Sequence, residues 1–149
     1  MEPLTFTVLG TPAPQGSKVR TRWGMREDNP NTRPWRQDVR AAALEAVGSD
    51  FTPYDGPVRV DVLFVFARPK AHYRTGKRAG ELRDDAPYWC DRKPDADKLA
   101  RAIGDALATI VLRDDSRIVA WDISKVYGAP ARCEITIDAV QSFARVAHR

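Results

Sequence analysis

The sequence predicts a single α+β domain in which helices pack on a mixed β-sheet. Its 149 residues suit one domain, and no internal repeat divides them. Segments with alternating apolar residues, typical of half-buried strands, occur beside segments with the apolar spacing of amphipathic helices. The expected order is strand, helix, strand, long basic loop, helix, strand, strand. We expect residues 1–140 to form the ordered core and residues 141–149 to form a frayed tail.

The first expected elements are a strand and a helix joined by a basic loop. Residues 4–9 (LTFTVL) are rich in β-formers and precede a glycine, which predicts a strand. The Pro- and Gly-rich segment 11–24 predicts a loop. A helix is expected from about Trp35 to Gly48, since Pro34 suits a first turn and good helix formers follow it. Its shared apolar face is predicted to hold Val39, Ala42, Ala43, Ala46 and Val47.

A second strand and a long basic loop follow. Alternate residues of the segment that begins at Gly56 are apolar, which predicts a half-buried strand. Apolar residues show no helical or strand periodicity between Arg68 and Pro94. This stretch is too long for a plain connector, so we expect it to be functional or mobile. The residues predicted to share the buried side of the strand are Val58, Val60, Val62, Phe64 and Phe66.

The last two expected strands are predicted to form a hairpin. In the segment 118–126, simple alternation places Ile118, Ala120, Asp122, Ser124 and Val126 on one side. In the segment 133–138, it places Cys133, Ile135 and Ile137 on one side. Gly128, Ala129 and Pro130 read as the turn between the two strands.

The bulk composition favours an anionic partner and argues against several protein classes. The net charge is +4, which favours binding to an anionic partner such as nucleic acid. The two cysteines, Cys90 and Cys133, lack metal-binding spacing, so we expect free thiols without a catalytic role in a reducing cytoplasm. No apolar run is long enough to span a membrane, and the first residues do not resemble a signal peptide.

The segment 93–105 (KPDADKLARAIGD) gathers carboxylates in this basic chain. It predicts a helix whose buried stripe consists of Leu99, Ile103, Leu107 and Ile110. The opposite side carries alternating charge, from Asp97, Arg101 and Asp105, with Lys98 near them. Asp95 precedes the helix as a plausible N-cap. One interpretation is structural, because such acids stabilise a helix by a few tenths to about 1 kcal/mol each.

A second acidic pair makes a metal site the alternative interpretation. Asp114 and Asp115 stand just before the strand at Ile118, where acids often serve only as turn residues. Carboxylates from a helix entrance and a strand entrance together offer hard oxygen ligands, which suit Mg²⁺ or Mn²⁺. Zn²⁺ is disfavoured because these motifs contain no His or Cys. In a basic chain, such a site would meet DNA phosphates.

Basic side chains in two loops are candidate DNA contacts. The first loop contributes Lys18, Arg20 and Arg22, and the long loop contributes Lys70, Arg74, Lys77 and Arg78. The simpler alternative is that both loops are merely solvated.

Four segments together resemble the RusA family of Holliday junction resolvases, which is common in phages and prophages. They are FTVLGTPAPQGSKVR, RPKAHYRTG, KPDADKL and RDDSRIV, and the likeness extends from about Phe6 to Ile137. The resemblance implies a small homodimer that cuts four-way DNA with Mg²⁺ or Mn²⁺. It implies paired, symmetric nicks across the branch, in DNA recombination and repair.

The resemblance also implies roles for individual residues. Asp95, Asp97 and Asp115 match the metal carboxylates, and Arg101 matches a basic residue that supports catalysis. Asp105, Asp114 and Lys125 match further family positions. Three residues depart from the common pattern: Lys98 replaces Asn, Arg101 replaces Lys, and Arg117 replaces Gln. Arginine keeps the charge but is poorly suited to proton transfer, so Arg101 is expected to neutralise phosphate.

The sequence therefore predicts a Mg²⁺-dependent, structure-selective endodeoxyribonuclease. Two alternatives stay open at this point. One is a non-catalytic branched-DNA-binding protein that uses the same basic surface. The other is another metal-dependent phosphohydrolase that acts on nucleotides.

Overall fold

The computed structural model describes residues 1–16, 18–27 and 29–141. Side chains are not described for residues 18, 19, 26 and 27. The predicted frayed tail lies outside the described residues, apart from Gln141.

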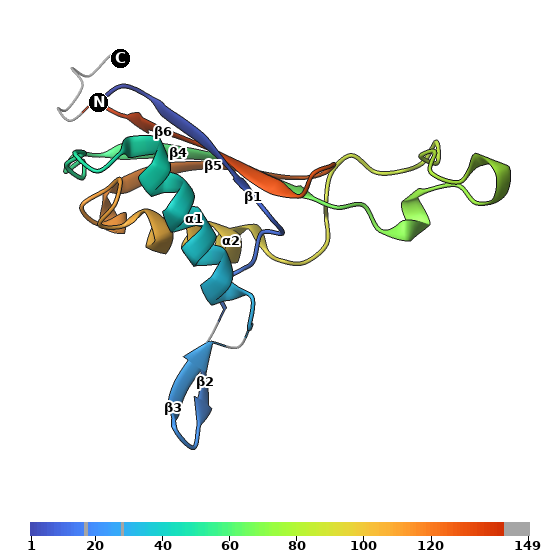
Figure 1. Ribbon diagram of the computed structural model, residues 1–149, viewed down its shortest axis with the longest axis horizontal. Helices are drawn as coiled ribbons and strands as arrows, with labels where there is room; N and C mark the ends of the chain where they lie inside the picture. The colour runs from blue at the N-terminus through green and yellow to red at the C-terminus, as the bar shows by residue number, and fades with distance from the viewer. Residues whose placement is uncertain (17, 28, 142–149) are drawn as a thin grey trace, which may run out of the picture.

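The centre of the molecule is a four-stranded mixed sheet with the strand order β1-β6-β4-β5. Strand β6 runs antiparallel to both of its neighbours, whereas β4 and β5 are parallel. The helices α1 and α2 lie on one face of this sheet (Figure 1). The predicted α+β class is thus confirmed. The element bounds are β1 Leu4–Leu9, α1 Thr32–Val47, β4 Val58–Phe66, α2 Ala96–Leu107, β5 Ile118–Tyr127 and β6 Arg132–Ala139.

The core lies between the sheet and the two helices, and local patterns predicted most of it. All five predicted β4 residues are buried, as are the three predicted β6 residues and the four-residue apolar stripe that begins at Leu99. Burial raises the pKa of the Cys133 thiol to about 12, which keeps it protonated and unreactive. Because the stripe that begins at Leu99 is buried, the apolar face of α2 is anchored in the core. The charged face of the helix is turned toward solvent.

The predicted hairpin of the last two strands is wrong, because β4 lies between β5 and β6. The connection between them crosses the end of β4, where the Gly128 N–H donates to the Phe66 carbonyl at 2.9 Å. Strand β4 buries Val65 as well as its alternating residues, so both of its faces are covered near this end. Such an apolar strand is stabilised most at the centre of a sheet.

A β-bulge near the start of β5 corrects the predicted alternation. Val58 is paired with Ile118 and Arg59 with Ala120, so Val119 is an extra residue in the ladder. The prediction placed Ile118 on the same side of the strand as Ala120. In the structure, Ile118 instead faces helix α2 together with Trp121. This change brings the entrance of β5 against the helix.

Helix α1 begins at Thr32, three residues earlier than expected, and is tied to both the N-terminal segment and α2. The Thr32 hydroxyl donates to the Pro14 carbonyl at 2.5 Å. The Arg40 guanidinium donates to the carbonyls of Ala106 and Ala108 at the end of α2, each at 3.1 Å. Within the described residues, no helix is long and apolar enough to cross a membrane.

The buried face of α1 differs in part from the prediction. Val39 and Ala43 are buried, while Ala42 and Val47 are half-buried. Ala46 is exposed, against the prediction, because it borders an open hollow beside Met1 and Phe51. Trp35 adds a large buried ring near the start of the helix.

The segment predicted as a loop contains a β-hairpin, formed by β2 (Lys18–Thr21) and β3 (Gly24–Glu27). Gly24 has φ +121° next to the turn, a conformation that favours glycine. The hairpin projects from the body of the molecule (Figure 1). It carries Trp23 at its tip with 90% of the residue exposed.

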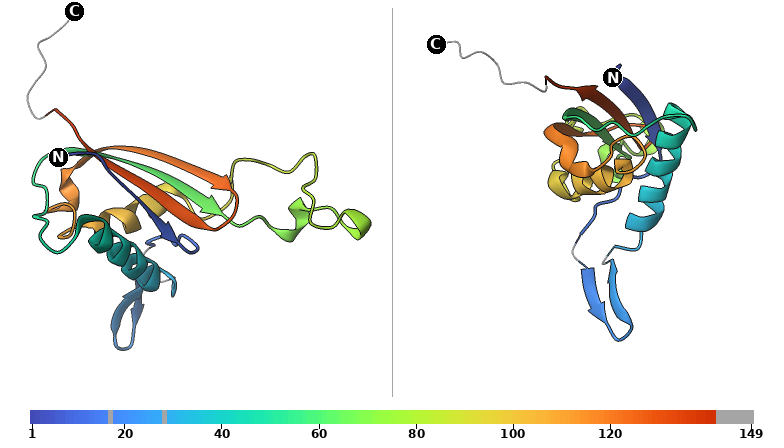
Figure 2. Two further views of the ribbon diagram at one scale, coloured as in Figure 1. Left: turned by 45° about the horizontal axis from the view of Figure 1, so that its top comes forward. Right: turned by 90° about the vertical axis from the view of Figure 1, so that its left-hand side faces the viewer.

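The long basic segment forms a second projecting arm (Figure 2). It contains two 3₁₀ turns, Lys70–His72 and Gly76–Arg78. The Arg83 N–H donates to the His72 carbonyl at 2.9 Å, so the chain folds back on itself. The Tyr127 N–H then donates to the Tyr88 carbonyl at 3.0 Å, which ties the returning chain to the end of β5. The arm thus has a defined backbone path.

Candidate functional site

Helix α2 begins with a carboxylate that is not used for capping. Asp95 is the N-cap residue, as predicted, but its side chain makes no cap hydrogen bond. Its Oδ2 lies 3.9 Å from the Lys98 Nζ instead. The Leu99 N–H donates to the Asp95 carbonyl at 3.1 Å, which is the first backbone bond of the helix. The Asp95 carboxylate is therefore exposed and available to a ligand.

A pocket of about 390 Å³ lies between α2 and the entrance of β5. We call it the acidic pocket, and its principal lining residues are Asp97, Arg101, Gly104, Asp115, Ile118 and Trp121. A Cβ atom on Gly104 would lie 3.7 Å from Trp121 and 3.8 Å from the Asp115 Cβ. A methyl group at position 104 would therefore make ordinary contacts, whereas a larger side chain would collide with the β5 entrance.

The two aspartates before β5 have opposite electrostatic environments. The hydrogen bond with Asp114, partial burial and the charges of Asp114 and Asp105 raise the pKa of Asp115. The pKa of Asp114 is lowered, chiefly because the Ser116 N–H donates to its carboxylate at 2.9 Å, and also by the bond with Asp115. Negative charge is therefore crowded around Asp115, and a cation beside it would relieve this repulsion.

The donor chemistry of the acidic pocket suits a hard divalent cation. Asp97 and Asp115 both offer carboxylate oxygens, and neither is ion-paired with a Lys or Arg among the residues that the structure describes. Across those same residues, however, no three His, Cys, Asp or Glu side chains are grouped closely enough to hold a metal ion. The structure brings Asp97, Asp115 and Arg101 into one pocket and does not bring Asp95 into it. The three-carboxylate metal site stays a prediction.

Two other predicted site residues on α2 and β5 make contacts outside the acidic pocket. Asp105 lies 3.9 Å from the Arg36 guanidinium of α1. The Lys125 Nζ donates to the Arg92 carbonyl at 2.6 Å, just before the KPD segment. Lys125 thus holds the end of the long arm, and no contact connects it with Asp115.

Arg117, one of the departures from the family pattern, supports the β5 entrance. Its guanidinium lies 2.8 Å from the Asp55 carboxylate, and Arg113 lies at the same distance. Hydrogen bonds from Arg117 and then Arg113 lower the pKa of Asp55. The turn that carries Asp114 and Asp115 is thereby tied to the loop before β4.

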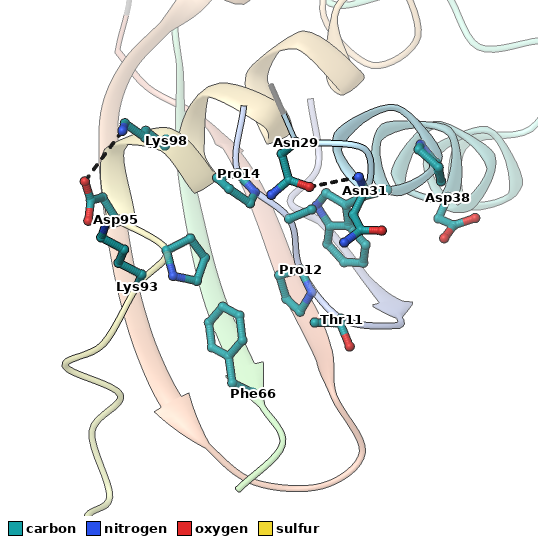
Figure 3. Close-up of a pocket in the computed structure, with 14 residues that line it drawn as sticks. Thr11, Pro12, Pro14, Asn29, Asn31, Asp38, Phe66, Lys93, Asp95 and Lys98 are labelled. Carbon is teal, nitrogen blue, oxygen red and sulfur yellow. Dashed lines mark hydrogen bonds and ion pairs between the residues drawn. The ribbon is translucent and has the colours of Figure 1, made fainter. Parts of the chain in front are cut away.

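A larger cavity of about 850 Å³ lies beside the first turn of α2 (Figure 3). We call it the large cavity. Asp95, Lys93 and Lys98 line it from the α2 side, and Asn29 and Asn31 line it from the start of α1. Sequence reasoning missed the two asparagines. They stand more than 60 positions before Asp95, and their only local signal is that of a helix start.

The candidate DNA-contact residues lie on the two projecting arms. Arg20 and Arg22 are on the β2–β3 hairpin, where the Arg22 guanidinium lies 5.6 Å from the centre of the Trp23 ring. The Lys18 side chain lies outside the described part of the chain.

On the long arm, two of the predicted cations are already paired. Arg74 lies 2.9 Å from Asp84 and Arg78 lies 2.8 Å from Glu81. Lys70 and Lys77 have no ion-pair partner within the described residues. These two lysines are the arm's most available phosphate ligands.

Comparison with known proteins identifies the family of this chain. The model of the family described as endodeoxyribonuclease RusA matches residues 7–138. The uncharacterized protein YqaN of Bacillus subtilis (strain 168) is 30% identical over 146 residues, which cover 95% of this chain and 100% of YqaN. The matched range includes both walls of the acidic pocket. The chain therefore belongs to the RusA family of endodeoxyribonucleases.

Proposed function

We propose that this protein is a Mg²⁺-dependent endodeoxyribonuclease that resolves Holliday junctions by paired, symmetric nicks. The observation that carries the proposal is the acidic pocket, where Asp97, Asp115 and Arg101 meet in a chain of the RusA family. The proposed setting is DNA recombination and repair in the cytoplasm of a bacterial or phage-infected cell.

The proposed roles follow from the chemistry of the side chains. Asp97 and Asp115 would hold Mg²⁺, or Mn²⁺ in its place, with Asp95 as the third carboxylate, and the bound ion would activate water and neutralise phosphate charge. Arg101 lines the same pocket and is exposed, so its guanidinium can donate to phosphate oxygens. It does not act as a base, because arginine stays protonated in proteins. Ile118 and Trp121 supply an apolar wall.

The two arms support a branched-DNA substrate. Arg20 and Arg22 lie on the β2–β3 hairpin, and Lys70 and Lys77 lie in the 3₁₀ turns of the long arm. The two arms project separately from the same body (Figures 1 and 2). Cations spread over two arms can follow phosphates on different DNA segments. The exposed Trp23 ring can stack on a base that is unpaired at the branch.

A homodimer completes the proposal. A four-way junction presents two equivalent strands, and a two-fold dimer would place one acidic pocket against each of them. Sedimentation of the purified protein should give a mass near twice that of the chain.

The decisive experiment is cleavage of a synthetic four-way junction with the metal varied. Asp97→Asn and Asp95→Asn should each abolish Mg²⁺-dependent nicking while junction affinity stays within a few-fold of wild type. Asp91→Asn is the matched control, since this exposed residue loses the same charge but lies outside both cavities. Wild-type nicking rates in Asp97→Asn would overturn the assignment.

Other substrates separate the proposal from its two rivals. Tight junction binding with no product at any Mg²⁺ or Mn²⁺ concentration would indicate a non-catalytic binding protein. Turnover of small phosphate esters with no preference for junctions over linear duplex would indicate another phosphohydrolase.

A further inference from the structure

The large cavity has the size of a small-ligand site and stands at a junction of four segments (Figure 3). It is enclosed by residues 11–14, the end of β4, and the first turns of α1 and α2. Its volume of about 850 Å³ lies within the range of small-molecule sites, which is roughly 300–1,000 Å³. Both helices direct their N-termini toward this region, since their N-cap residues Asn31 and Asp95 line it. Helix N-termini favour anionic groups.

The walls of the cavity are flat and apolar. The Phe66 and Trp35 rings and four prolines form their apolar part, and both rings are largely buried, with Phe66 8% and Trp35 3% exposed. The Trp35 Nε1–H is buried and has no hydrogen-bond partner in the described structure. This donor is closed off from solvent, so the polar contacts of the cavity come from its rim. Flat apolar surfaces with a polar contact suit a nucleobase.

Two amides, two lysines and two carboxylates line the rim of the cavity: Asn29, Asn31, Lys93, Lys98, Asp38 and Asp95. The Asn31 N–H donates to the Asn29 Oδ1 at 2.8 Å, and the Asn31 side chain makes no helix-cap bond. The Asn31 amide is therefore available to a base edge, on which amides pair with adenine in particular. Lys93 is exposed and has no ion-pair partner among the described residues. It can therefore take a phosphate.

We propose that the large cavity takes one unstacked nucleotide of the DNA strand that is cut. Its base lies against Phe66, Asn29 and Asn31 read the base edge, and Lys93 holds its phosphate. The cavity and the acidic pocket share the first turn of α2, through Asp95 and Asp97, so this nucleotide is next to the cleaved bond. The cavity therefore determines the sequence preference of cleavage. This inference rests on the proposed function and specifies how its substrate is read.

Unstacking is measured with 2-aminopurine, whose fluorescence rises when it leaves a base stack. The probe is placed singly at each position around the cleaved bond of a four-way junction, and binding is followed without divalent metal. The expected result is a several-fold rise at one position, with little change at its neighbours. Thr11→Trp, which fills the cavity, should remove the rise. Thr7→Trp is the matched control, because Thr7 is an exposed β1 residue outside the cavity.

Sequence preference gives a second readout. Cleavage rates are compared on junctions that differ in a single base pair at the cut site. Asn31→Ala should reduce the ratio of the best to the worst rate at least several-fold, whereas Arg33→Ala in the same helix turn should lower affinity without changing that ratio. Asn31→Ala should fold normally, because the side chain caps nothing.

The outcomes distinguish this inference from the function on which it rests. A wild-type protein that neither binds nor cuts junctions would overturn both. A protein that cuts junctions but shows no position-specific fluorescence rise would overturn the cavity assignment alone. So would loss of affinity in Lys93→Ala together with an unchanged preference in Asn31→Ala, which would indicate a site for phosphate only.

Discussion

The two cavities beside the first turn of α2 differ in the balance of charged side chains that line them. The acidic pocket combines Asp97 and Asp115 with Arg101, whereas the large cavity combines Asp38 and Asp95 with Lys93 and Lys98. Asp95 is the N-cap residue, with the extended backbone angles φ −69° and ψ 143°, whereas Asp97 lies inside the first turn, so the two side chains leave the chain in different directions. The start of one helix can therefore present carboxylates to two cavities.

This difference shows that aspartates two positions apart in the sequence can stand in different electrostatic environments. Repulsion around Asp115 favours a cation, whereas the Asp95 carboxylate is partly balanced by Lys98, whose Nζ lies 3.9 Å away. A substrate strand that spans both cavities would place a phosphodiester at the acidic pocket and its neighbouring nucleotide in the large cavity.

The sharpest test of the comparison is Asp115→Asn. We expect it to lower single-turnover nicking of a four-way junction by at least about 100-fold, as the loss of one preorganised electrostatic group in an active site does. Asp114→Asn should lower it much less, because Asp114 accepts from the Ser116 N–H and does not line the pocket. Equal losses in the two variants would contradict the distinction between them.

The next test changes the shape of the acidic pocket and leaves its carboxylates in place. Gly104→Leu should separate α2 from the β5 entrance, with a destabilisation of about 1–3 kcal/mol from overpacking. Nicking should fall, while the 2-aminopurine signal from the large cavity should persist. Denaturant unfolding and the two DNA assays measure these effects.

Gly104→Ala is the matched control at the same position. Its Cβ would meet its neighbours no closer than 3.7 Å, which is ordinary contact. It should stabilise the helix by about 0.5–1 kcal/mol and retain nicking. Strong inactivation by this single methyl group would show that the approach of β5 to α2 is not as described.

The smallest expected effect is the dependence of stability on pH. The folded state raises the pKa of Asp115, so its contribution to stability is present below the unfolded pKa of about 3.9 and is lost as pH rises through the folded pKa. Without metal, Asp115→Asn should therefore gain stability relative to wild type as pH rises from about 4 to 7. The gain should be under about 0.5 kcal/mol, because the residue is exposed.

The contribution of Asp114 to stability should change with pH in the opposite direction. Its pKa is lowered, so its contribution is present above the unfolded pKa and lost as pH falls through the folded pKa. Asp114→Asn should lose stability relative to wild type at neutral pH. Thermal unfolding of both variants at several pH values checks the pair, and shifts of the same sign would argue against the described environments.

The sequence by itself determined the elements whose signals are local. Alternation in β4 and β6 and the apolar stripe of α2 were predicted correctly, because burial on one face leaves a short-range period in the chain. The motifs around Asp95 and Asp115 likewise indicated the family, which the match over residues 7–138 shows.

Only the tertiary structure decided how those elements meet. It placed β4 between β5 and β6, inserted the bulge at Val119, and set Asn31 across a cavity from Asp95. It also divided Asp95 from Asp97 and Asp115. Each of these features depends on contacts between segments that are distant in the sequence. Such contacts are set by the total burial and hydrogen bonding of the sheet, so they leave no periodic pattern in the local sequence.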